Sequence, residues 1–245
     1  MKKLGFGILI VIVVLTLSGI AVAISNQGAE KAKAPDLEKI EFIHWKKDFA
    51  KPGSARAPKT PTCYAFLGKY GKTYLKWLTL PVSYVINPTN PQELTEEFIT
   101  NAIFNSAETW DAATSKDLMS NDYTIDYTAT YGVQDYKNAI SFGDYPTEGV
   151  IAVTTVWYNP ATKAIVEFDI MFDTDWTWGD ATVSSTVMDL QNIATHEFGH
   201  GVGLGDVYED ACSAVTMYGY SDYGETQKRD LEPPDVTGLQ TLYGI

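Results

Sequence analysis

The stretch HEFGHGVGLGD, residues 196–206, decides how this 245-residue chain is read. Apolar periodicity around it predicts a helix over residues 186–202, which places His196 and His200 one turn apart on one face. Both imidazoles can then reach a single metal ion. Glu197 follows His196 directly and is turned toward the open coordination position, where it can accept a proton from water.

The residues after the histidine pair supply a third ligand. Gly203 lies three residues after His200, and a glycine there can end the helix in a left-handed conformation. The resulting turn brings Asp206 back toward the two histidines. Two histidines and one carboxylate suit one catalytic Zn²⁺, with the fourth position left for water. The competing interpretation is a helix that carries two surface histidines and no metal.

The motif resembles the HExxHxxGxx[H/D] pattern of the metzincin zinc proteases. Residues 215–218 look like the Met-turn beneath the metal, which makes Met217 the floor of the site. Residues 235–244 resemble the last helix of matrixin-type catalytic domains, and 77–86 their first strand. The resemblance covers about residues 63–245 and implies a metzincin-like zincin fold of the α+β class. That fold has a twisted, mixed five-stranded sheet, an active-site helix and a C-terminal helix.

Two features depart from the common matrixin pattern. Asp206 stands where matrixins usually have a histidine, which is similar to small secreted proteases of the snapalysin type. The His-rich structural zinc site of animal matrixins cannot be present, because His44 is the only other histidine. We interpret His44 as an ordinary residue of the segment before the domain.

The pattern of the remaining chain also predicts an α+β domain. Thr186 to Asp189 predicts a capping box at the start of the active-site helix. The other expected elements are strands at 80–87, 123–131 and 138–142, a hairpin of 149–158 with 164–172, and helices at 92–113 and 235–243.

The resemblance assigns two further sites. Asp173 and Asp175 follow the strand whose end helps to hold structural calcium in matrixins, so Ca²⁺ is a second candidate ion; the alternative is a solvated acidic loop. Residues 149–158 match the edge strand that carries the substrate in this class. Thr154 and Thr155 suit the rim of such an edge, and the alternative is a plain core strand.

Cys63 and Cys212 are the only cysteines, and in an exported protein they most simply form one disulfide. A second interpretation is an inhibitory cysteine switch at Cys63, although the arginine and glycine that flank such a cysteine are absent. Two free thiols are the third.

Residues 1–23 predict an export signal or an N-terminal anchor, because Lys2 and Lys3 precede an apolar run and Ala21 to Ala23 offer a cleavage site. Residues 24–62 are interpreted as a linker or short pro-segment, and 63–245 as the catalytic domain. The predicted location is extracellular, or the outer face of the cytoplasmic membrane. Membrane contact then comes only through an uncleaved N-terminal segment, and a monomer is favoured.

Charge is distributed unevenly. Residues 1–76 hold 13 of the 18 basic residues but only 5 of the 31 acidic ones. The acidic remainder repels phosphate backbones, which argues against nucleic-acid partners.

The function predicted from these features is an exported zinc endopeptidase that acts on protein or peptide substrates. Two alternatives stay open. One is a thermolysin-type zincin with Glu225 or Glu232 as third ligand; the other is a surface-exposed binding module whose zinc is structural.

Overall fold

The computed structural model describes residues 36–49, 62–71 and 73–245, which belong to one compact unit of Pro35–Ile245. The predicted signal or anchor at residues 1–23 lies outside these residues. In the described ranges, none of the helices has the length and apolarity needed to cross a membrane.

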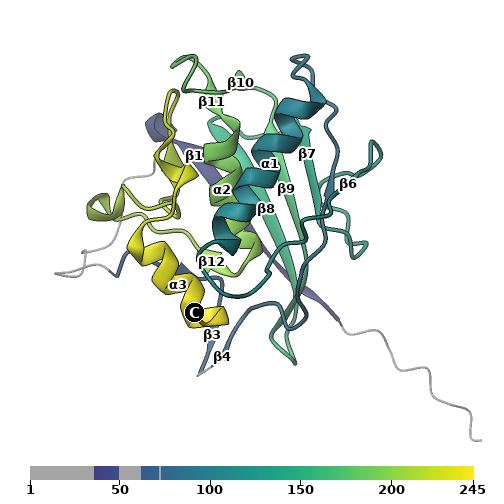
Figure 1. Ribbon diagram of the computed structural model, residues 1–245, viewed down its shortest axis with the longest axis vertical. Helices are drawn as coiled ribbons and strands as arrows, with labels where there is room; N and C mark the ends of the chain where they lie inside the picture. The colour runs from purple at the N-terminus through teal and green to yellow at the C-terminus, as the bar shows by residue number, and fades with distance from the viewer. Residues whose placement is uncertain (1–35, 50–61, 72) are drawn as a thin grey trace, which may run out of the picture. The chain divides into compact units, whose positions relative to one another are not determined.

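A mixed sheet forms one layer of this unit (Figure 1). Five neighbouring strands, in the order β8-β9-β7-β5-β6, make the predicted five-stranded core of the sheet, and β1 and β13 extend it to seven along the β8 edge. β8 and β9 form the expected antiparallel hairpin, whereas β9, β7, β5 and β6 pair in parallel. The bounds are β1 Glu38–Lys46, β5 Val85–Ile86, β6 Thr124–Ile125, β7 Ala139–Gly143, β8 Val150–Asn159, β9 Ala164–Asp173 and β13 Tyr220–Ser221.

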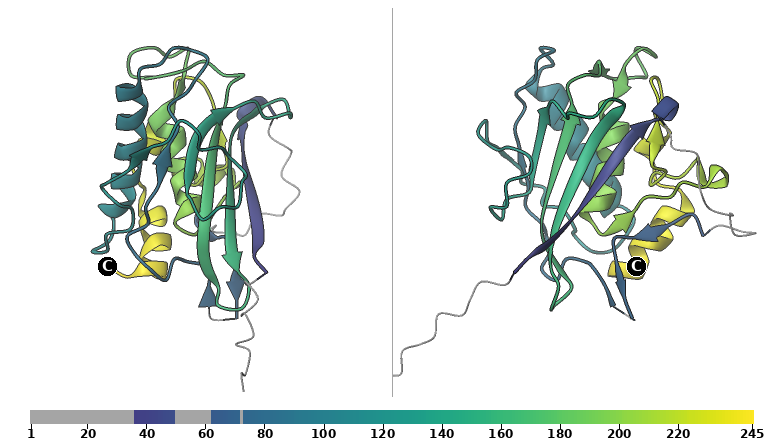
Figure 2. Two further views of the ribbon diagram at one scale, coloured as in Figure 1. Left: turned by 90° about the vertical axis from the view of Figure 1, so that its right-hand side faces the viewer. Right: turned by 180° about the vertical axis from the view of Figure 1, so that it is seen from behind.

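Two helices cover one face of the sheet, as the edge-on view of Figure 2 shows. α1 (Glu96–Asp111) and α2 (Leu190–Gly201) pack against each other, and α3 (Pro233–Tyr243) closes the chain. The α+β class, the active-site helix and the C-terminal helix are therefore confirmed. Short elements complete the unit: β2 Ala65–Phe66, β3 Lys69–Tyr70, β4 Thr73–Tyr74, β10 Trp178–Gly179, β11 Met188–Asp189, β12 Leu204–Gly205, η1 Lys47–Phe49, η2 Asp210–Cys212 and η3 Gln227–Arg229.

α2 lies in the middle of the core. Every residue from Asn192 to Gly201 is buried, so both faces of the helix contact protein. Trp110 of α1 donates from Nε1 to the carbonyl oxygen of Thr195 at 2.8 Å. Gly199 lets the helix approach its neighbours, since a Cβ there would lie 2.2 Å from the Met217 sulfur and 2.7 Å from the Trp110 ring. These contacts fix the position of α2 along its axis and its rotation about that axis, and so place His196 and His200.

Several predicted boundaries were too wide. The strand expected over 80–87 is reduced to β5, and the one over 123–131 to β6, because turns and loop hydrogen bonds replace ladder pairing on either side. α2 begins at Leu190 instead of 186. The predicted capping box is wrong: Asp189 is itself the N-cap and accepts from the backbone N–H of Asn192 at 2.8 Å. A side chain that accepts this bond must sit outside the first helical turn.

The sequence interpretation contained no strand at residues 38–46. The structure places this segment, β1, along the outer edge of β8, as the rear view in Figure 2 shows. A segment read as part of a linker or pro-segment thus takes part in the main sheet, and it passes the face of α2 that carries His196 and Glu197.

Candidate metal centre

Three side chains converge at the C-terminal half of α2. The Nε2 atoms of His196 and His200 lie 3.1 Å and 3.5 Å from the same carboxylate oxygen, Oδ1 of Asp206. All three side chains are nearly inaccessible to solvent, with at most 6% exposure. His196 Nε2 and Asp206 Oδ1 are buried and lack any partner in hydrogen-bonding geometry among the described residues. Buried polar atoms are rarely left unpaired, so this arrangement fits a bound cation.

Asp206 reaches the histidines because the chain reverses at Gly203. The backbone of Gly203 has φ +111°, a conformation that side-chain-bearing residues rarely adopt, and its N–H donates to the carbonyl oxygen of His200. β12 follows and pairs with β2. Asp206 comes directly after β12, and Tyr208 donates from its hydroxyl to Asp206 Oδ2 at 2.9 Å. Oδ1 is thereby left to face the histidines.

The Nδ1 atoms of both histidines, which face away from Asp206, are hydrogen-bonded to backbone carbonyls. His196 Nδ1 donates to Thr216 at 2.7 Å, and His200 Nδ1 donates to Leu204 at 2.9 Å. A proton on Nδ1 leaves the lone pair on Nε2, which is the state that a metal ligand needs. The backbone therefore presets both imidazoles for metal binding.

Met217 lies beneath the histidine helix, where the Met-turn resemblance puts it. Its side chain is fully buried and contacts α2 at Gly199. The backbone N–H groups of Thr216 and Met217 donate to the carboxylate of Asp235 in α3, at 2.9 and 3.2 Å. Since Thr216 also accepts from His196, α3 supports the metal centre through this turn.

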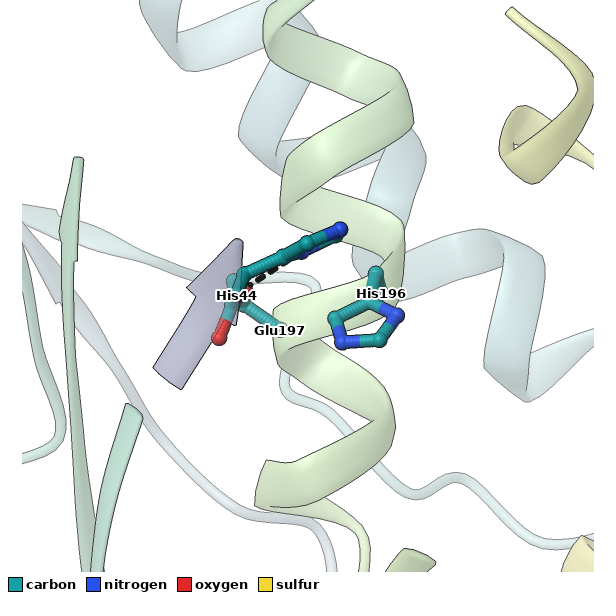
Figure 3. A group of neighbouring side chains, drawn as sticks. All are labelled: His44, His196 and Glu197. Atoms are coloured by element: carbon teal, nitrogen blue, oxygen red, sulfur yellow. Dashed lines mark hydrogen bonds and ion pairs between the residues drawn. The ribbon is translucent and has the colours of Figure 1, made fainter. Parts of the chain in front are cut away.

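Glu197 projects from α2 toward the sheet, beside the metal centre. Thr154 of β8 donates to its Oε2 at 2.5 Å, and the ring of His44 lies with Nδ1 3.0 Å from Oε1 (Figure 3). Burial raises the pKa of the Glu197 carboxyl to about 7, although His200 and Thr154 act in the opposite direction. A carboxyl group with a pKa near neutrality can both take up and release a proton.

The interpretation of His44 as an ordinary residue is wrong. It is 1% exposed and lies between Glu197, Ser221 and Lys228, with its ring 3.9 Å from that of His196. His44, His196 and Glu197 also form a group of close ligand atoms. Both ring nitrogens of His44 are engaged by protein, however, so the group with Asp206 fits a metal better. The alternation of Ile40, Phe42 and His44 was the available sequence signal.

Lys228 in η3 is a fully buried charged residue beside His44 that the sequence interpretation did not single out. Its ammonium group is fully buried, and the carbonyls of Tyr218 and Tyr220 accept hydrogen bonds from it. Burial lowers the pKa of Lys228 to about 7, against the attraction of Asp206, Glu225 and Glu197. A buried lysine is costly unless its ammonium group is hydrogen-bonded, and here two backbone carbonyls and the His44 ring supply the partners.

The structure gives no support to Glu225 or Glu232 as the third ligand. Glu225 pairs with Lys47 and accepts from the backbone of Asp222. Glu232 caps α3 through a capping box with Asp235. Among the described residues it is Asp206 that completes the histidine pair.

Thr154 and Thr155 were predicted to lie at the rim of an exposed edge strand, and the structure does not place them there. Both are buried, at 0% and 1% exposure, because β1 pairs along the edge of β8 that was expected to be open. Thr154 faces Glu197, whereas Thr155 points to the opposite face and contacts the hydroxyl of Tyr131 at 2.7 Å.

Asp173 and Asp175 lie together at the end of β9. Asp144, which follows the neighbouring strand β7, joins them, and ligand oxygens of all three lie within 4.8 Å of one another. Asp173 Oδ2 is buried without a hydrogen-bond partner in the described ranges, and burial raises the pKa of this carboxyl to about 6. Sequence reasoning missed Asp144 because the parallel pairing of β7 with β9 was not assigned.

Cys63 and Cys212 form a disulfide. The bond joins the start of the predicted catalytic domain to the loop that carries Asp206 and Met217, where Val207, Val215 and Tyr218 pack around Cys212. With its sulfur in this bond, Cys63 is not placed to act as an inhibitory metal ligand.

Comparisons with known proteins agree with this geometry. A family model described as matrixin, peptidase family M10, matches residues 76–244. The hatching enzyme of Paracentrotus lividus is 27% identical over 166 residues, which are 67% of this chain and 25% of that protein. Metalloendoproteinase 2-MMP of Arabidopsis thaliana is 30% identical over 172 residues, 66% of this chain and 41% of that protein. Neutrophil collagenase of Homo sapiens is 27% identical over 174 residues, 69% and 34% respectively. The match covers well under half the length of each of these relatives.

Proposed function

This chain belongs to the matrixin family, and from that premise we propose that it is a zinc-dependent endopeptidase acting on extended protein or peptide substrates. One observation carries the proposal: Nε2 of His196, Nε2 of His200 and Oδ1 of Asp206 face one another in a buried site. Two imidazoles and one carboxylate are a ligand set typical of catalytic zinc.

The residues around the site have complementary roles in peptide hydrolysis. Zinc, when bound, supplies a Lewis acid that polarises the scissile carbonyl and makes water more acidic. Glu197 accepts the proton of the attacking water and passes it to the leaving amine. Thr154 orients the Glu197 carboxylate through its 2.5 Å hydrogen bond. The substrate strand is β8, with Thr154 on the catalytic face, and Met217 supports the site without taking part in proton transfer.

The remaining expectations complete the proposal. Residues 1–23 act as export signal or anchor, 24–62 as a pro-segment that includes β1, and the enzyme works as a monomer outside the cytoplasmic membrane. The disulfide supports export, since disulfides persist in oxidising compartments.

Calcium is proposed as a structural ion at Asp144, Asp173 and Asp175. Millimolar Ca²⁺ should raise the melting temperature of the parent protein by a few degrees and leave Asp173→Asn unchanged. Equal shifts in the two proteins would contradict the site.

A surface-exposed binding module with structural zinc is the second candidate. It gives no reason for a buried carboxylate beside the metal ligands, whereas hydrolysis requires one. Incubation of the purified chain with casein, with and without a chelator, separates the two. Chelator-sensitive cleavage that returns with added Zn²⁺ supports the protease. Stable zinc binding without cleavage, even after the Phe42→Ala substitution that loosens β1, supports the module.

A further inference from the structure

β1 runs through the groove beside the metal centre as an extended chain that is paired on both edges. It lies antiparallel to β8, from Glu38 opposite Tyr158 to Trp45 opposite Val150, and parallel to β13. The N–H of Trp45 faces the carbonyl of Gly219 at 3.4 Å, and the N–H of Lys46 donates to Gly149 at 2.9 Å. Extended peptides bind to proteins by this kind of strand addition.

Side chains of β1 contact the catalytic residues directly. The ring of Phe42 stacks on His200 with centroids 4.1 Å apart, and the ring of His44 lies 3.9 Å from His196. Alternate residues of a strand face the same side, so Phe42 and His44 both point to α2 while Ile43 points away. The backbone between them passes over the histidine pair, which is the path a substrate of the proposed enzyme must take.

The side chain of His44 enters a polar pocket. Its Nε2 lies 3.0 Å from Ser221 Oγ and 3.0 Å from Lys228 Nζ. Two of the three ammonium hydrogens of Lys228 go to the carbonyls of Tyr218 and Tyr220. α2 anchors the pocket, because Asn192 accepts from the Lys228 backbone at 2.7 Å. The third hydrogen of Lys228 and the Ser221 hydroxyl both face the occupant.

We infer that Lys228 and Ser221 form the side-chain subsite that selects substrates, and that it takes glutamate or glutamine next to the cleaved bond. β1 occupies this subsite as a substrate analogue, with His44 in the position of the selected residue. The inference rests on the proposed function and adds a substrate class to it.

Reach and hydrogen bonding define that class. In histidine, Nε2 lies four bonds from Cα, and so do the terminal oxygens of glutamate and glutamine, whereas those of aspartate and asparagine lie three bonds away. A carbonyl or carboxylate oxygen accepts two hydrogen bonds, so it can satisfy Lys228 and Ser221 together. An apolar side chain would leave two buried donors unpaired, which is unfavourable.

The first experiment needs no catalysis and uses the full chain. Hydrogen exchange of the β1 amides is measured for His44→Gln and His44→Leu, each with Lys228 intact and with Lys228→Met. With Lys228 present, Gln should keep the parent protection, and Leu should lose it about tenfold or more. In the Lys228→Met background the two should become equal. Equal protection of Gln and Leu with Lys228 intact would overturn the subsite.

A milder variant guards against misfolding of Lys228→Met. Ser221→Ala removes one donor and keeps the ammonium group, so it should reduce the Gln-over-Leu difference severalfold without abolishing it. An unchanged difference would show that Ser221 does not contact the selected side chain, which contradicts the assignment.

The second experiment maps cleavage sites of the full chain on a mixture of unstructured peptides. Glu and Gln should be enriched next to the cleaved bond, and Lys228→Met should shift the preference to Leu and Met by tenfold or more. Lys116→Met, at an exposed position, is the matched control and should keep the parent profile.

The outcomes separate the subsite from the catalytic proposal. Cleavage with an apolar preference in the parent overturns the subsite and leaves the protease intact. Absence of chelator-sensitive cleavage by both the full chain and Phe42→Ala, in which β1 docks more weakly, overturns the protease, and with it the role of this pocket in substrate selection.

Discussion

Glu197 stands between two surroundings that differ in how their polar atoms are paired. On the metal side, His196 Nε2 and Asp206 Oδ1 face each other without hydrogen bonds. On the groove side, both ring nitrogens of His44 are engaged by Glu197, Ser221 and Lys228. An ion on the metal side would give these unpaired atoms their missing partners. A substrate on the groove side must first displace β1. In the proposed enzyme, catalysis therefore requires an ion on the metal side and removal of β1 from the groove side.

The largest effect is expected from Glu197, which both regions share. Glu197→Gln keeps the size of the side chain but removes the proton acceptor, so casein hydrolysis should fall by about 10²–10⁴-fold. Zinc content and melting temperature should stay close to those of the parent, because the three ligands remain. Activity within a few-fold of the parent would show that Glu197 is not the base.

On the metal side, Asp206 provides the sharpest test. Asp206→Ala leaves two histidines, and zinc affinity should drop by at least about 100-fold, since even residues that only support ligands cost 10–100-fold. Asp206→His should retain the ion, because imidazole nitrogen and carboxylate oxygen reach zinc at nearly the same distance. Metal analysis after dialysis against a mild chelator measures both. Stoichiometric zinc in Asp206→Ala would identify another residue, such as Glu209 or Asp210, as the ligand.

The loop that supplies the metal side is held by the disulfide, and its removal tests how much that side depends on the cross-link. The Cys63→Ser/Cys212→Ser double variant should lose about 2–5 kcal/mol of unfolding free energy, since the bond closes a loop with a sequence separation of 149. Denaturant titration measures the loss. Thiol titration of the unfolded, unreduced parent should find no free thiol, and two reactive thiols would contradict the pairing.

Changes on the groove side should raise activity, whereas changes on the metal side lower it. Phe42→Ala removes the ring that stacks on His200 and weakens the docking of β1, so casein hydrolysis by the full chain should rise by up to about tenfold, equivalent to 1.4 kcal/mol of docking free energy. Lys39→Ala, at an exposed position of the same strand, is the control and should change nothing. A fall in activity for Phe42→Ala at constant zinc content would mean that β1 supports the site instead of covering it.

The sequence predicted more of the residues on the metal side than on the groove side, and the reason is physical. The spacing of His196, Glu197 and His200 is fixed by one helix, and Asp206 follows through a short turn at Gly203. All of these lie within eleven consecutive residues, so local geometry suffices.

The groove depends on pairing between residues far apart in the chain. His44 meets Glu197 across 153 positions, and Lys228 meets His44 across 184. Asp144 likewise joins Asp173 only through the parallel pairing of β7 and β9. No local periodicity encodes such pairs. The sequence shows all three histidines, but the position of His44 beside Glu197 can be known only from the fold.

The disulfide also determines which parts of the molecule stay covalently joined after a cut in the backbone. Cys63 lies after β1, so the covalent link to Cys212 secures the chain from that point onward and leaves β1 attached only through residues 47–62. While that connection is intact, β1 meets its groove within one molecule, so the contact does not depend on protein concentration. One cut between β1 and Cys63 would turn the contact into an ordinary bimolecular equilibrium. The fraction of molecules with an uncovered groove would then be set by the concentration of the freed peptide and its dissociation constant, and would rise on dilution.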